Sequence, residues 1–76
     1  MDLSNLKAGE RYAFHIKPFE PPIGDVIPGA VKERRYVGAR SIGAVGTPAE
    51  PFAEVERDDG TRHLIAVSTI DAIMVV

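Results

Sequence analysis

The chain has 76 residues and no cysteine, and its formal net charge is −2, from nine Lys plus Arg against eleven Asp plus Glu. A chain of this length makes a single small domain, residues 1–76, which buries only about 60% of the surface that its unfolded form exposes. The lack of cysteine excludes disulfides and thiolate chemistry, and the near balance of charge leaves no global field to attract nucleic acid or an anionic membrane.

The first ten residues, MDLSNLKAGE, carry neither the basic nor the apolar region of a secretory signal. Elsewhere in the chain no apolar run approaches the roughly 18 to 20 residues that span a bilayer. We therefore expect a cytoplasmic protein that does not contact a membrane.

The next feature in chain order is the short segment LSNLKAG. Leu3 and Leu6 stand three positions apart, which favours a helical turn with both side chains on one side. Asp2 and Ser4 supply side chains that can cap its start, and Gly9 can end it. The pattern predicts one helical turn, too short to be stable alone.

Residues 10–17, ERYAFHIK, alternate strictly between apolar and polar side chains. Tyr12, Phe14 and Ile16 fall on one face, which predicts a half-buried strand. The following residues 18–29 contain four prolines and two glycines. Because proline cannot donate to a sheet ladder, this segment is expected to be a long, stiffened loop.

A second strand is predicted over residues 30–38, rich in valine and in charge. Val31, Val37 and Ala39 are in phase with one another, and the opposite phase carries Lys32, Arg34 and Tyr36. Residues 38–51 are interrupted by glycine and proline, and this predicts a loop, or a continuation of the strand through a bulge at one of the glycines.

A β-hairpin is predicted from two alternating segments, residues 52–57 and 61–67, that flank Asp58-Asp59-Gly60. An Asp-Gly pair supplies the positive φ that a tight turn requires.

Ser68 and Thr69 favour a turn, and residues 72–76, AIMVV, are predicted to form a last short strand. The sum is an all-β chain of five strands with a short N-terminal helical turn, and closure into a small barrel would remove its exposed edges.

The order of the elements in TRHLIAV, STID and AIMVV resembles the end of an SH3-like barrel, in which a hairpin is followed by one 3₁₀-like turn and a last strand. Together with LSNLKAG at the start, the chain is similar to the Sm-like variant of that barrel. The resemblance implies a five-stranded barrel whose copies associate edge to edge. The Sm-like RNA-binding step before the last strand is replaced here by Val67-Ser68-Thr69, so no nucleotide-pocket residue is carried over.

Residues that could support catalysis or metal binding are few. Ser41 and Ser68 lie in no nucleophile elbow, and His15 and His63 stand on different predicted strands without metal-ligand spacing. Both histidines are expected to face solvent or to be hydrogen-bonded. We expect no enzyme activity, no cofactor and no metal.

A cluster of basic residues with one aromatic is the strongest polar candidate. It consists of Lys32, Arg34, Arg35, Tyr36 and Arg40. A basic strand face with an aromatic for base stacking is how small barrels bind single-stranded RNA or DNA. The alternative is a solvated sheet face, in which Glu33, Glu54 and Glu56 form cross-strand pairs with these cations.

The last strand is apolar on both faces. Its residues are Ile73, Met74, Val75 and Val76. A monomeric barrel buries only one face of such a strand, so the other face is expected to form an oligomer interface. Our main hypothesis is thus a self-associating, non-catalytic binding or structural module, a homo-oligomer; the alternative is a barrel that binds single-stranded nucleic acid through the basic cluster.

Overall fold

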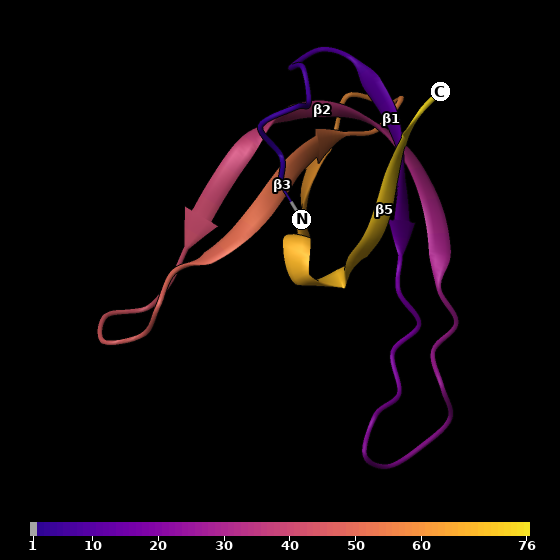
Figure 1. Ribbon diagram of the computed structural model, residues 1–76, viewed down its shortest axis with the longest axis vertical. Helices are drawn as coiled ribbons and strands as arrows, with labels where there is room; N and C mark the ends of the chain where they lie inside the picture. Colours follow the sequence, from indigo (N-terminus) through magenta and orange to yellow (C-terminus); the bar gives the residue numbers. More distant parts are fainter. Residues whose placement is uncertain (1) are drawn as a thin grey trace.

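The computed structural model describes residues 2–76 and consists of one five-stranded antiparallel sheet in the order β4-β3-β2-β1-β5 (Figure 1). The elements are β1 Arg11–Ile16, β2 Ala30–Ile42, β3 Glu50–Glu56, β4 Arg62–Ala66, the 3₁₀ turn η1 Val67–Thr69 and β5 Ile70–Val75. No α-helix occurs in this part of the chain. The all-β prediction is confirmed.

The strand predicted over residues 10–17 is confirmed as β1, which lies between β2 and β5. Its alternation places Tyr12 and Phe14 in the core, and Phe14 is completely buried. Ile16 is partly buried and packs against the same cluster. β1 pairs with β2 along its whole length and with β5 from Tyr12 to Ile16, so it is an interior strand of the sheet.

Strand β2 is longer than the predicted residues 30–38. It continues through Gly38 to Ile42, and it pairs with β1 up to Arg35 and with β3 from Arg35 onward. Its pairing with β3 shifts register between Tyr36 and Gly38. The alternation in the sequence left open which face of β2 is buried, and in the structure Val31 is exposed and Tyr36 is buried. The pairing decides this, because Arg34 lies opposite Tyr12 and therefore shares its face.

The hairpin predicted around Asp58-Asp59-Gly60 is confirmed as β3 and β4. Gly60 has φ +88°, the conformation that its turn position requires. The Asp59 carboxylate accepts hydrogen bonds from the Thr61 backbone N–H at 2.9 Å and from its hydroxyl at 2.7 Å. Strand β3 contributes the fully buried Val55 to the core.

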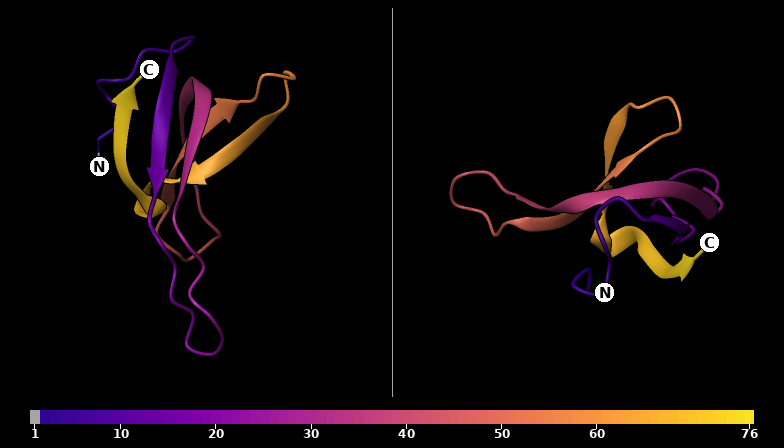
Figure 2. Two further views of the ribbon diagram at one scale, coloured as in Figure 1. Left: turned by 90° about the vertical axis from the view of Figure 1, so that its right-hand side faces the viewer. Right: turned by 90° about the horizontal axis from the view of Figure 1, so that it is seen from above.

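The chain crosses from one edge of the sheet to the other through η1, which carries it from β4 to β5 (Figure 2). The Thr69 carbonyl accepts a hydrogen bond from the Lys17 N–H at 2.8 Å, which fixes η1 to the end of β1. The sheet is curved, but in the described residues it is not closed. β4 and β5 remain its two edges.

The expected N-terminal helical turn is a single hydrogen-bonded turn, closed by the Leu6 N–H and the Leu3 carbonyl at 3.0 Å. Asp2 caps it by accepting a hydrogen bond from the Ser4 N–H. It does not propagate into a helix, because the Gly9 N–H donates to the Tyr36 carbonyl and draws the chain into the sheet.

The proline-rich segment is a loop, as predicted, and it projects away from the sheet (Figure 1). One isolated bridge crosses it, with Phe19 and Ile27 exchanging both backbone hydrogen bonds. Ile23 at its tip is almost fully exposed. The loop therefore adds apolar surface to the molecule and contributes no residue to the buried core.

Candidate functional site

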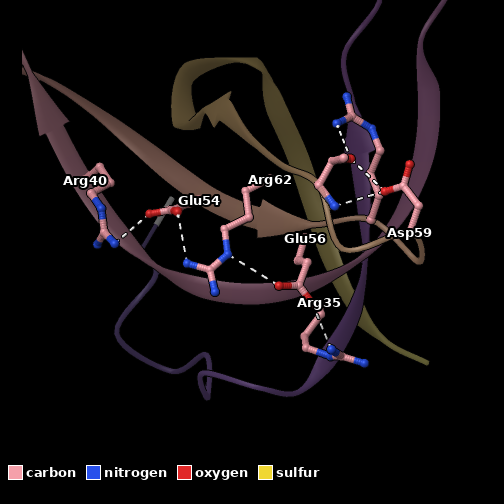
Figure 3. Close-up of polar contacts among 8 residues, drawn as sticks. Arg35, Arg40, Glu54, Glu56, Asp59 and Arg62 are labelled. Atoms are coloured by element: carbon pink, nitrogen blue, oxygen red, sulfur yellow. Dashed lines mark hydrogen bonds and ion pairs between the residues drawn. The ribbon is translucent and has the colours of Figure 1, made fainter.

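A ladder of ion pairs runs across β2, β3 and β4 on one face of the sheet (Figure 3). Glu54 binds Arg40 at 2.6 Å and Arg62 at 3.7 Å. Glu56 binds the same Arg62 at 3.3 Å and Arg35 at 2.9 Å. The two carboxylates thus alternate with three guanidinium groups along a continuous chain of contacts.

The cross-strand pairs predicted by the alternative interpretation of the basic cluster are present for two of its members. Arg35 and Arg40 each have a carboxylate partner, and the Glu54 and Glu56 side chains are only 16% and 19% exposed. A paired guanidinium attracts an external phosphate less than a free one, because the nearby carboxylate repels the phosphate. Two of the three positive charges on this face are therefore offset by carboxylates within it.

Tyr36, the expected stacking aromatic of the basic cluster, lies in the core with 5% of its surface exposed. Burial raises the pKa of its phenol. Its ring is not available to stack on a base, because it belongs to the buried core cluster against which Leu3 and Leu6 pack. The sequence interpretation needed this ring on the surface, and the register of β2 turns it inward.

The five residues of the basic cluster do not share one surface. Lys32 and Arg34 lie on the side of β2 that carries Tyr36, and Arg35 is on the opposite side, since adjacent residues in a strand alternate. After the register shift, Arg40 joins Arg35 on the ladder side, because it lies opposite Phe52 and forms an ion pair with Glu54.

Arg34 makes a contact that the sequence reasoning missed. Its Nε donates a hydrogen bond to Nε2 of His63 on β4, at 3.1 Å, and its Nη1 donates to the Glu33 carbonyl at 2.8 Å. Burial lowers the pKa of His63, and the positive charges of Arg57, Arg34 and Lys32 lower it further. His63 and Ile65 are two residues apart on β4, so their side chains lie on the same face of the sheet. This spacing could have shown from the sequence that His63 is on the core side.

The last strand forms an exposed edge of the sheet. Ile73 is half-buried and packs against the core, whereas Met74, Val75 and Val76 are exposed, Val75 to 83%. A groove of about 600 Å³ runs beside this strand, and its apolar lining includes Leu6 and Tyr12. The four residues predicted as an oligomer interface therefore lie together at an unpaired edge.

Other residues that were considered for chemistry lie apart. The Ser68 hydroxyl donates to Glu50 at 3.3 Å, and Ser41 sits at an exposed end of β2 opposite Pro51. Among residues 2–76 no group of three His, Asp or Glu side chains could hold a metal ion. Within the same residues no helix is long and apolar enough to cross a membrane.

Comparison with family models, with curated proteins and with solved structures gave no match.

Proposed function

We propose that this protein is a non-catalytic module that self-associates through its sheet edges, and that its curved sheet is an SH3-like barrel of the Sm-like kind. The order β5-β1-β2-β3-β4 with a 3₁₀ turn between β4 and β5 supports that fold. The observation that carries the function is the last strand, an unpaired edge with exposed Met74, Val75 and Val76. Such an edge aggregates unless a partner covers it.

The occupant we propose for the β5 edge is the β4 edge of a second copy. In an antiparallel register that places Leu64 of one copy opposite Met74 of the next, Ile65 meets Ile73 and His63 meets Val75. Leu64 and Met74 are both exposed in the single chain. The exposed Leu64, Met74 and Val75 then bury apolar surface, and the backbone ladder adds hydrogen bonds that neither edge makes alone.

This contact joins two different edges, so each copy keeps one β4 edge and one β5 edge to offer. Such heterologous contacts generate a ring when the rotation between copies closes, and an open chain when it does not. A binding or structural role follows from an assembly of this kind. Single-stranded nucleic acid is the less favoured partner of the ladder face, because Tyr36 is buried and Arg35 and Arg40 are paired.

The test is the molar mass of the protein in solution, measured by light scattering after gel filtration at micromolar concentration. We expect an oligomer for the wild type and a folded monomer for Met74→Asp, because a carboxylate opposite Leu64 cannot be buried unpaired in the new interface. The control is Val45→Asp, which places the same carboxylate at a fully exposed site in the β2–β3 loop, outside both edge strands. It should leave the molar mass unchanged.

Two results would contradict the proposal. A wild-type monomer would remove self-association altogether. An oligomer that survives both Val75→Asp and Met74→Asp would show that the copies meet elsewhere. Far-ultraviolet circular dichroism of each variant establishes that the chain is folded before its mass is interpreted.

A further inference from the structure

Three cations and one histidine gather on the core side of the sheet, and we call them the core-side cation cluster: Lys32, Arg34, Arg57 and His63. The other four arginines of the chain, Arg11, Arg35, Arg40 and Arg62, are each ion-paired with a carboxylate. Across residues 2–76 the three cations of the cluster make no such pair within 4.0 Å.

The sheet register brings these four side chains together. Lys32 lies opposite Phe14 and Arg34 opposite Tyr12, so both project from β2 toward the core side. His63 lies opposite Val55, which is also on the core side. Arg57 directly follows Glu56, the last residue of β3, and Glu56 pairs with Arg35. Continuing the same antiparallel register by one residue places Arg57 beside Arg34.

The surrounding charges leave the cluster without a counter-ion of its own. The nearby carboxylate of Asp58 forms an ion pair with Arg11 instead. The hydrogen bond from Arg11 is the main reason that the pKa of Asp58 is lowered, and the charge of Arg34 contributes less. Like charges held close together in a partly buried site repel one another, and an oxyanion between them converts the repulsion into attraction. The cluster thus has the charge and the donors of a site for an anion.

The Arg34–His63 hydrogen bond fixes the state of the histidine. Because Arg34 Nε donates, Nε2 of His63 accepts and carries no proton. Protonation of Nε2 would replace an acceptor by a donor, so the hydrogen bond would break and Arg34 would be free to donate elsewhere. The same proton would add a fourth positive charge to the cluster.

We propose that Lys32, Arg34 and Arg57 bind a phosphate group, and that His63 controls the site by holding Arg34 when neutral and joining the donors when protonated. The ligand chemistry is a tetrahedral oxyanion, carried either by a free phosphorylated compound or by the backbone of a single-stranded nucleic acid. The site does not rest on self-association, and the monomeric Met74→Asp variant, whose new carboxylate lies on the opposite face of the sheet, allows it to be tested alone.

The control by His63 has a definite sign. Burial, together with the neighbouring cations, holds the pKa of His63 below its ordinary value of 6.5. A bound oxyanion offsets those cations, so binding must raise that pKa, and by linkage a lower pH must strengthen binding. Inorganic phosphate itself changes charge near neutral pH, whereas sulfate keeps two negative charges, so sulfate is the probe for this effect.

The experiment is a titration of the ¹⁵N-labelled full chain with sodium sulfate at pH 5.5 and pH 7.5, followed by NMR, with sodium chloride at equal ionic strength as the reference. Sulfate should shift the side-chain signals of Arg34, Arg57 and His63, and the apparent affinity should be at least about fivefold higher at pH 5.5. In a separate pH titration, sulfate should raise the pKa of the His63 imidazole. No sulfate-specific shift at pH 5.5 would overturn the proposal.

The decisive variants are Arg34→Gln and Arg35→Gln, which remove the same charge from adjacent residues on opposite faces of β2. Arg34→Gln should weaken sulfate binding about tenfold, the effect of losing one charge-assisted donor, and Arg35→Gln less than about twofold. Equal losses in the two variants would show a response to net charge and would refute the site. If Arg34→Gln does not fold, Lys32→Gln replaces it with the same expectation.

Two further probes distinguish the sources of the phosphate group. Thymidine 5′-monophosphate and a ten-residue oligothymidylate are titrated into the same samples. Equal affinity per molecule assigns the site to a free phosphorylated compound. Tighter binding of the oligonucleotide, with an affinity that falls steeply with salt, assigns it to a nucleic-acid backbone.

Discussion

The core makes a quantitative prediction at Val55, a fully buried side chain near the end of β3. Val55→Ala removes the equivalent of two methylene groups, which is worth about 1.6 kcal/mol of transfer free energy at about 0.8 kcal/mol each. The residual cavity adds to this, and a total loss of about 2–3 kcal/mol is expected. A chain of this size has a free energy of unfolding of only about 4–11 kcal/mol, so the loss is a large share of it.

Urea unfolding followed by circular dichroism measures this loss, and the melting temperature should fall by about 10–20 °C. The matched control is Val45→Ala, the same chemical change at a fully exposed valine, for which a change within about 0.5 kcal/mol is expected. Equal unfolding midpoints for the two variants would refute the assignment of β3 to the centre of the core. Both measurements are made on the Met74→Asp background, so that association does not contribute to the stability.

Two further predictions concern a glycine and a histidine. Gly29→Ala would place a Cβ 2.5 Å from the Ile16 carbonyl oxygen, a backbone atom that cannot rotate away, and should lower the free energy of unfolding by about 1–3 kcal/mol. In the control Gly38→Ala, the new Cβ meets only the movable end of the Arg40 side chain, so the urea midpoint should be nearly unchanged. Similar urea midpoints for the two variants would contradict the close approach at Gly29. The free energy of unfolding should fall as pH drops below about 6.5, because the pKa of His63 is lowered in the folded chain and the unfolded chain therefore binds more protons there. His63→Gln should flatten this part of the plot of unfolding free energy against pH. An unchanged slope in that variant would exclude His63 as the source of the pH dependence.

The parts of the fold that could be predicted depend on local signals. Residues 10–17 alternate without exception, and Asp59-Gly60 marks its turn regardless of what surrounds it, so β1 and the β3–β4 hairpin follow from the sequence. The core face of β2 does not. Tyr36 and Val31 compete for the inward position, and the pairing of Arg34 opposite Tyr12 decides between them. That pairing is a contact between distant residues, which a pattern within β2 does not contain.

Strand pairing also explains why the basic cluster predicted from neighbouring residues in the sequence is divided between two faces in the structure. Glu54 and Glu56 occupy one face of β3, and the register of β2 against β3 determines which arginines can reach them. Arg35 falls on that face and is neutralised, whereas Arg34, one residue earlier, faces His63 and keeps its charge free of a carboxylate. A register shifted by one residue would exchange the two roles, since it moves every side chain of a strand to the other face. The difference between a paired surface arginine and a candidate anion ligand therefore lies in the strand pairing, and it is why adjacent charge-matched variants are the sharpest test of the core-side cation cluster.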